Sequence, residues 1–179
     1  MEKQCVFAGF GGQGILTAGL LLASIGAMQN REVTWIPSYG SEMRGGTANC
    51  TVKLSDDPIA SPFAKKIDIL VAMNQPSLEK FISQMKEGGI IIYDSSIIKE
   101  KPDKSDVHII EIPATSLCEK ISYERGANIC MIGALAGSTD LFEKENYETG
   151  INQYFAKNPQ FHKSNQIAFL SGYEYVQGR

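Results

Sequence analysis

Short apolar runs alternate along the chain with longer stretches in which apolar residues recur at helical spacing. The short runs predict buried strands; they lie at residues 4–8, 33–36, 47–54, 67–73, 90–93 and 107–112. The longer stretches predict helices; they lie at residues 15–28, 76–85, 114–125, 128–136, 142–155 and 163–176. This alternation predicts one doubly wound α/β domain over residues 1–179, with a largely parallel sheet and helices on both faces.

Prolines and glycines set several of the expected boundaries. Pro37 is expected to stop the second strand, so that residues 38–46 form a polar loop. Gly88 and Gly89 are expected to end the helix over residues 76–85. In a doubly wound sheet, ligands are expected beyond the carboxyl ends of the strands.

Composition and charge narrow the possible partners. The 179 residues are 43% hydrophobic and 21% charged, with a formal net charge of -3 and no long basic run. This argues against nucleic acid and an anionic membrane surface as partners. The apolar segment 15–28 is shorter than the ~20 residues of a membrane span, and the first residues lack the pattern of a signal peptide. We therefore expect a cytoplasmic protein.

The residues typical of metal or catalytic sites are few. No two of the cysteines (Cys5, Cys50, Cys118 and Cys130) have the two-residue gap that is typical of zinc or iron–sulfur ligation. We expect buried free thiols and no metal site in this chain. His108 and His162 are expected to be packing or surface residues, and no nucleophile and base pair up. No catalytic residue is therefore predicted, and the chain has the character of a binding subunit.

A glycine-rich hexapeptide joins the first strand to the first helix. Its members Gly9, Gly11 and Gly14 match the pattern G-x-G-x-x-G, with Gly12 and Gln13 between them. Such a turn lets backbone N–H groups approach a phosphate or pyrophosphate at the helix N-terminus. The alternative is a turn that only packs a helix against a sheet. NAD is disfavoured because an acid is expected at the end of the second strand, whereas Glu32 precedes that strand.

A second cluster, residues 37–47, combines glycines, hydroxyls, a carboxylate and a guanidinium. The guanidinium of Arg44 is suited to a bidentate contact with phosphate or carboxylate. An ordinary loop with an Arg44–Glu42 surface pair is the competing interpretation. The candidate binding residues of this loop are Ser38, Tyr39, Gly40, Glu42, Arg44, Gly45 and Gly46.

Together the two motifs resemble the gamma subunit of 2-oxoacid:ferredoxin oxidoreductases. The similarity rests on the hexapeptide 9–14 and on residues 35–50, and it continues through residues 58–62, 73–75, 128–135 and 165–173. It covers most of the chain, and the two motifs at this distance are specific.

The resemblance implies a Rossmann-like fold and a role in a complex. Such a complex oxidatively decarboxylates a 2-oxo acid, joins the acyl group to coenzyme A and passes two electrons to ferredoxin. Thiamine diphosphate and iron–sulfur clusters are expected on partner subunits, of alpha, beta and ferredoxin-like delta type. Carried over to this sequence, the resemblance makes Gly11, Gly12, Gln13 and Arg44 candidates for contacting coenzyme A or a neighbouring subunit.

The resemblance leaves the substrate and the role of the chain open. The segment 35–46 is closer to the 2-oxoglutarate and 2-oxoisovalerate branches than to the pyruvate branch, with indolepyruvate a lesser alternative. Two other functions remain: a self-sufficient nucleotide-dependent oxidoreductase, and a purely structural assembly subunit.

Overall fold

A computed structural model describes residues 2–39, 47–63 and 66–178 of the chain. Within these residues, six strands form one sheet in the order β2-β3-β1-β4-β5-β6. The strands are β1 (Lys3–Phe10), β2 (Glu32–Tyr39), β3 (Thr47–Ser55), β4 (Ile67–Ala72), β5 (Met85–Asp94) and β6 (His108–Ile112). All six predicted strands are therefore confirmed, although β2 extends three residues beyond its predicted end and β5 begins five residues before its predicted start.

The sheet is largely parallel, as the alternation of strands and helices predicted. β3 pairs antiparallel with both β1 and β2, while β4 is parallel to β1 and β5, and β6 is parallel to β5. β3 is thus the one strand of the described sheet that runs against the others. β3 lies between β1 and β2 in the sheet. The connection from β1 through the following helix to β2 therefore passes over the position that β3 occupies.

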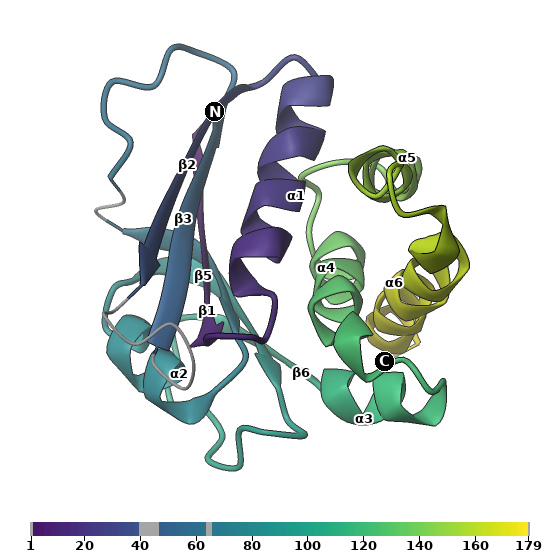
Figure 1. Cartoon of the computed structure of the whole chain (residues 1–179). Helices are drawn as coiled ribbons and strands as arrows, with labels where there is room; N and C mark the ends of the chain where they lie inside the picture. Colours follow the sequence, from purple (N-terminus) through teal and green to yellow (C-terminus); the bar gives the residue numbers. More distant parts are fainter. Residues whose placement is uncertain (1, 40–46, 64–65, 179) are drawn as a thin grey trace.

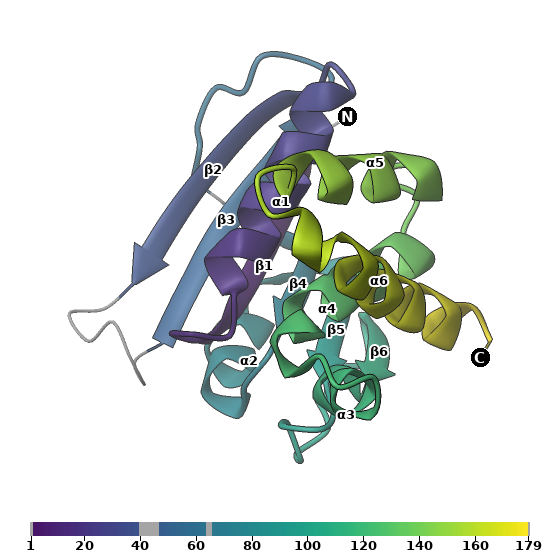
Figure 2. The ribbon, with the colours of Figure 1, turned by 45° about the vertical axis from the view of Figure 1, so that its right-hand side comes forward.

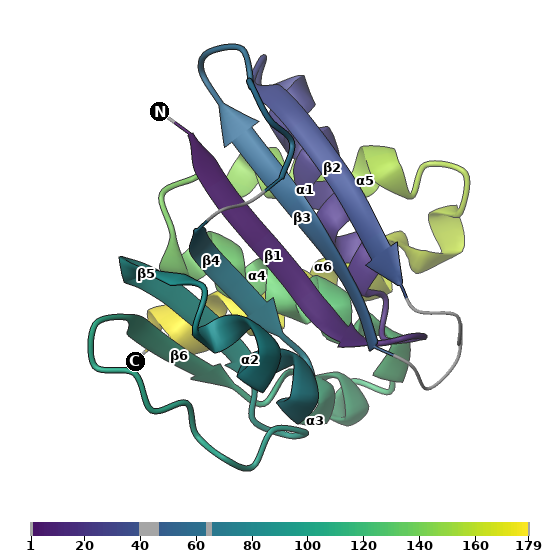
Figure 3. The ribbon, with the colours of Figure 1, turned by 90° about the vertical axis from the view of Figure 1, so that its left-hand side faces the viewer.

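Helices cover both faces of the sheet. They are α1 (Ile15–Met28), α2 (Gln75–Ile82), α3 (Ala114–Lys120), α4 (Ala127–Ser138), α5 (Lys144–Tyr154) and α6 (His162–Gln177), with 3-10 turns at Glu124–Gly126 and Pro159–Phe161. α1, α4, α5 and α6 lie on one side (Figures 1 and 2), and α2 lies on the other (Figure 3). The doubly wound architecture is confirmed. Among the described helices, none is long and apolar enough to cross a membrane.

Each face of the sheet carries its own apolar core. The larger core lies under α1 and α4–α6, and it includes Phe7, Leu22, Tyr147 and Phe169. The smaller core lies under α2 and includes Val6, Leu78 and Ile91. Val6 and Phe7 are neighbours on β1 and point to opposite faces, as alternation along a strand requires.

The four cysteines are free and buried, as the sequence predicted. Cys5 and Cys50 are fully buried in the larger core, on β1 and β3. Because the core excludes water, burial raises the pKa of both thiols to about 12. Both therefore stay protonated in the folded chain at neutral pH.

The expected end of the second strand at Pro37 is wrong. β2 continues through Pro37 to Tyr39, with Pro37 opposite Cys50 of β3. β2 is the edge of the sheet, so it has a hydrogen-bonded neighbour on one side only. A proline without an N–H group is tolerated at such an edge.

The helix predicted over residues 76–85 is too long at its carboxyl end. α2 ends at Ile82, and Met85 already begins β5, where it pairs with Ile67 of β4. Gly88 and Gly89 lie inside β5, at a shift in the β4–β5 register, and Gly88 has a φ of 72°. A local irregularity in a strand is a common place for glycine.

The sheet has a topological switch point between β1 and β4. The chain leaves β1 into α1 on one face and leaves β4 into α2 on the other (Figures 1 and 3). The two connections diverge, and doubly wound folds bind ligands at this place, beyond the carboxyl ends of the strands. The glycine hexapeptide follows β1 directly, so it lies at the switch point.

Candidate functional site

The glycine turn, residues Gly11–Gly14, joins the end of β1 to α1. The backbone N–H of Gln13 donates to the carbonyl of Phe10 at 3.2 Å and closes the turn. Gly12 has a φ of 98° and Gly14 a φ of 73°, a region that side-chain-bearing residues rarely adopt. The tip at Gly12 is exposed, and a Cβ atom built there would meet no atom of the described residues within 4 Å, its chain neighbours aside.

The side chain of Gln13 folds back under the turn. Its Oε1 accepts from the backbone N–H of Phe10 at 2.6 Å, and its Nε2 donates to the carbonyl of Met73 at 2.9 Å. Phe10 ends β1, and Met73 directly follows β4. The amide of Gln13 therefore spans the switch point.

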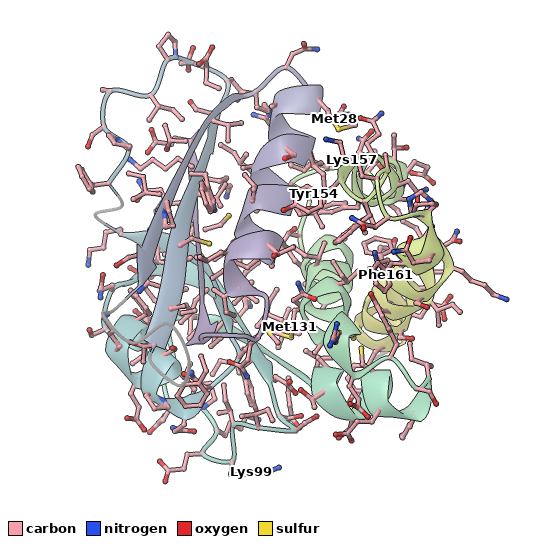
Figure 4. All side chains as sticks on the ribbon, in the orientation of Figure 1. Met28, Lys99, Met131, Tyr154, Lys157 and Phe161 are labelled. Atoms are coloured by element: carbon pink, nitrogen blue, oxygen red, sulfur yellow. The ribbon has the colours of Figure 1, made fainter. Side chains whose placement is uncertain are left out.

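The other end of the turn contacts α4. The Nδ2 of Asn128 donates to the carbonyl of Gly14 at 3.2 Å, and a Cβ atom on Gly14 would lie only 2.4 Å from that nitrogen. α1 and α4 are in contact, and Figure 4 shows the buried Met131 of α4 close to the amino end of α1. The amino ends of the two helices therefore lie side by side.

The amino end of α1 is electrostatically suited to an anion. Its N-cap is Gly14, no side chain of the described residues caps it, and its first turn contains no acidic residue. A helix of this kind carries roughly half a positive charge at its amino end, from N–H groups without intrahelical partners. A phosphate beside the exposed turn would satisfy both the N–H groups and the charge.

Two side-chain amides with buried atoms, those of Asn74 and Gln75, follow β4 at the carboxyl ends of the parallel strands. Asn74 caps α2, because its Oδ1 accepts from the backbone N–H of Ser77 at 2.8 Å. The Nδ2 of Asn74 and the Oε1 of Gln75 are buried without a hydrogen-bond partner among the described residues. Buried amide atoms are normally satisfied, so these atoms are further candidates for contact with a ligand. The sequence showed them only as part of the family resemblance, since no motif of their own marks them.

Asp94, at the end of β5, is fully buried but already occupied. Its carboxylate accepts from the backbone N–H of Ser96 at 3.0 Å, and from the backbone N–H and hydroxyl of Thr115 at 3.2 and 2.5 Å. These bonds tie β5 to the start of α3. Asp94 therefore has a structural role, in which it joins the carboxyl end of β5 to the amino end of α3.

The structure brings part of the predicted site together. Gly9, Gly11, Gly12, Gln13 and Gly14 form or flank the turn. Ser38 and Tyr39 end β2, and Tyr39 pairs with Ala48, which lies one residue after the Thr47 that pairs with Phe10. The ends of β1 and β2 therefore flank the start of β3. The remaining loop candidates, Gly40, Glu42, Arg44, Gly45 and Gly46, lie outside the described residues.

Glu32, which was expected before the second strand, is its first residue, and the two histidines were expected to be packing or surface residues. Glu32 begins β2, far from its carboxyl end, so it is not positioned for the ribose contact of an NAD site. His108 is exposed at the start of β6. A ring nitrogen of His162 lies 2.9 Å from the carbonyl of Phe155. Both histidines are therefore surface or packing residues, as predicted.

The chain is similar to known proteins over almost its whole length. The family described as pyruvate ferredoxin/flavodoxin oxidoreductase matches residues 4–175. The chain is 38% identical to the 2-oxoglutarate synthase subunit KorC of Methanocaldococcus jannaschii, over 99% of this chain and 95% of that protein. It is 36% identical to the ketoisovalerate oxidoreductase subunit VorA of Methanothermobacter thermautotrophicus, over 98% of this chain but only 37% of that longer protein.

Solved structures share the fold. The gamma subunit of a keto/oxoacid ferredoxin oxidoreductase from Geobacter sulfurreducens superimposes with a TM-score of 0.84 at 27% identity, with 99% of both chains covered. The 2-oxoglutarate:ferredoxin oxidoreductase of Magnetococcus marinus superimposes with a TM-score of 0.87 at 23% identity, over 99% of this chain and 31% of that one. The chain therefore belongs to the pyruvate ferredoxin/flavodoxin oxidoreductase family, as the two glycine motifs indicated.

Proposed function

We propose that this chain is the gamma subunit of a 2-oxoacid:ferredoxin oxidoreductase complex. The complex would decarboxylate a 2-oxo acid, transfer the acyl group to coenzyme A, release CO2 and pass two electrons to ferredoxin. The observation that carries the proposal is the match to the oxidoreductase family over residues 4–175. The alignment with a 2-oxoglutarate synthase subunit over 99% of the chain supports it.

The part of the reaction assigned to this chain is contact with coenzyme A. Three features are of the kind that binds phosphate and polar atoms: the exposed tip at Gly12, the amino end of α1, which no described side chain caps, and the two amide atoms without a described partner, Nδ2 of Asn74 and Oε1 of Gln75. The related enzyme from Magnetococcus marinus was solved with coenzyme A bound. We place the phosphates of coenzyme A at the turn, with Arg44 as a further contact from the loop.

The redox cofactors are assigned to partner subunits. We propose that thiamine diphosphate and the iron–sulfur clusters lie on subunits of alpha, beta and ferredoxin-like delta type. The four buried cysteines of this chain are spread through the larger core and have the character of packing residues. The single gamma-type domain over residues 1–179 and the cytoplasmic location stay predictions.

Two 2-oxo acids fit the relatives about equally well. The curated relatives include 2-oxoglutarate synthase and ketoisovalerate oxidoreductase subunits, and each kind reaches 38% identity. We therefore propose 2-oxoglutarate or 2-oxoisovalerate as the substrate, with the choice made outside this chain. The chain spans only 32% and 37% of two VorA relatives, so in those proteins a similar domain is joined to further polypeptide.

The assembly and the substrate can be tested together. The chain is purified by affinity from its own cells without oxygen, and the eluate is assayed for viologen dye reduction with coenzyme A and several 2-oxo acids. We expect copurified thiamine and iron–sulfur subunits and activity with one of the two proposed acids. A chain that is isolated alone, without activity under these conditions, contradicts the proposal.

The contact with coenzyme A can be tested by one pair of variants at the tip of the turn. Gly12→Asp and Gly12→Asn have nearly the same size, and Asp and Asn both tolerate positive φ better than most residues. A carboxylate ~6 Å from a phosphate near the surface costs about 1–3 kcal/mol. We therefore expect the KM for coenzyme A in the intact complex to be roughly fivefold or more higher for Gly12→Asp than for Gly12→Asn.

The loop is tested in the same assay. Arg44→Ala is expected to raise the KM for coenzyme A. Arg31→Ala serves as its control, because Arg31 precedes β2, at the amino end of that strand, and pairs with Asp56. Equal KM values for the two Gly12 variants would show that the turn does not face a phosphate. If Arg44→Ala leaves both the KM and complex assembly unchanged, the loop assignment is wrong.

A further inference from the structure

The glycine turn is held at both ends by side-chain amides. At one end, Gln13 bonds to the backbone of Phe10 and Met73; at the other, Asn128 bonds to the carbonyl of Gly14. Between these points, Gly12 at the tip is exposed, and no atom of the described residues outside its chain neighbours crowds it. The ends of the turn are therefore fixed by tertiary contacts, while its tip is exposed.

We infer that Gln13 is a positioning residue, which presets the turn for its ligand by joining it to the end of β4. The inference rests on the proposed contact with coenzyme A. The ligand would be contacted by the backbone of the turn, and the Gln13 side chain would act through that backbone. This assigns to the glutamine of the hexapeptide a role different from direct ligand contact.

The chemistry of the two bonds requires a glutamine. Phe10 offers a backbone N–H and Met73 a backbone carbonyl, so one side chain must accept at one atom and donate at another. A primary amide is the group that does both in a fixed geometry. A glutamate would keep the acceptor but would place a carboxylate against the carbonyl of Met73.

Gly9 makes room for this side chain. A Cβ atom on Gly9 would lie 2.6 Å from the Oε1 of Gln13 and 2.7 Å from the Cδ1 of Ile15. Gly9 is itself buried at the end of β1. The first glycine of the hexapeptide is thus required by the folded-back side chain of Gln13 and by the packing of α1.

The bonds of Gln13 should matter to binding, because a preset turn avoids part of the cost of ordering it. When only a fraction of the molecules has the binding conformation, the apparent dissociation constant is the intrinsic one divided by that fraction, so it rises as the fraction falls. Loss of two ordinary hydrogen bonds within the chain is expected to weaken binding roughly 3- to 10-fold. The chemical step would be unaffected, since Gln13 would not touch the reacting atoms.

The test is Gln13→Met in the intact complex, because methionine has a similar length and makes neither bond. We expect the KM for coenzyme A to rise roughly 3- to 10-fold, while kcat and the KM for the 2-oxo acid stay within about twofold. The matched control is Gln177→Met. The Nε2 of Gln177 also donates to a backbone carbonyl, that of Gly137 at 2.6 Å, but on α6 at the carboxyl end of α4, away from the turn.

The outcomes separate this inference from the proposed function. An unchanged KM for coenzyme A in Gln13→Met overturns the positioning role, and so does a fall in kcat/KM that is equal for coenzyme A and for the 2-oxo acid, which would indicate a role in folding alone. If Gln13→Met does not assemble, Asn128→Ala at the other end of the turn is judged by the same criteria. If the two Gly12 variants differ in KM but Gln13→Met behaves as wild type, only the positioning role fails. If the Gly12 variants are equal, the coenzyme A contact itself fails.

Discussion

Raising the pH from about 9 to 11 is expected to destabilise the purified chain by roughly 5 kcal/mol through two buried thiols alone. The thiols of Cys5 and Cys50 have an ordinary pKa of 9.0 and a pKa of about 12 in the folded chain, because both are buried. Below pH 9, both states keep the protons. Above it, the unfolded chain loses them while the folded chain keeps them, so stability falls by about 1.4 kcal/mol per pH unit for each thiol. Urea unfolding at a series of pH values measures this slope.

The control is a Cys5→Ala/Cys50→Ala double variant. Its absolute stability is expected to be lower, because two buried sulfur atoms are lost, but its curve between pH 9 and 11 should be flatter. The pKa of Tyr147 is raised by burial, and that of Cys130 by its hydrogen bond with Cys118 and by burial. Both groups stay in both proteins and leave a residual slope. Parallel curves for the wild type and the double variant would show that these two thiols do not carry the alkaline transition.

Gly172→Ala is expected to lower the free energy of unfolding by about 2–4 kcal/mol. α4 and α6 approach each other at their backbones: a Cβ atom on Gly172 would lie 1.9 Å from the carbonyl oxygen of Cys130, and one on Gly133 would lie 2.0 Å from that of Phe169. Backbone atoms cannot turn aside, so the two helices must separate. The gain of about 1 kcal/mol that alanine brings to a helix is too small to offset this.

The matched control for Gly172→Ala is Ser171→Ala, one position away on α6. The hydroxyl of Ser171 bonds within its own helix, to the carbonyl of Ile167, so its loss should change stability by less than about 0.5 kcal/mol. Urea unfolding of both variants at neutral pH makes the comparison. If the Gly172→Ala midpoint is within error of that of Ser171→Ala, the close approach of α4 and α6 does not limit the fold. Because Gly133 lies at the same crossing, a double alanine variant should be less destabilised than the sum of the two single variants.

The strength of the local signals explains which elements could be predicted. α1 has the predicted bounds, because a glycine turn marks its start and its apolar residues continue to Met28. β2 and α2 were misjudged at their ends, at Pro37 and Met85. In both places the neighbouring strand decides: the edge position of β2 tolerates a proline, and pairing with Ile67 draws Met85 into β5.

The candidate site also has a part that local sequence predicted and a part that it did not. The hexapeptide and its position between a strand and a helix predicted the turn, because glycine adopts the positive φ seen at Gly12 and Gly14 more readily than any other residue. The sequence could not show that Gln13 reaches Met73 or that Asn128 reaches Gly14, since these partners are 60 and 114 positions apart. For the same reason, Asn74 and Gln75 were not expected in the site.

The sequence by itself determined the alternation of strands and helices, the glycine turn, the buried thiols and the family, because these depend on local composition and on motifs read in order. Tertiary structure alone decided that β3 lies between β1 and β2, that the switch point falls between β1 and β4, and that two side-chain amides hold the turn there. Strand order and long-range hydrogen bonds depend on which distant segments bury their surfaces against each other. That choice is made by the packing of the whole chain, and no single segment encodes it.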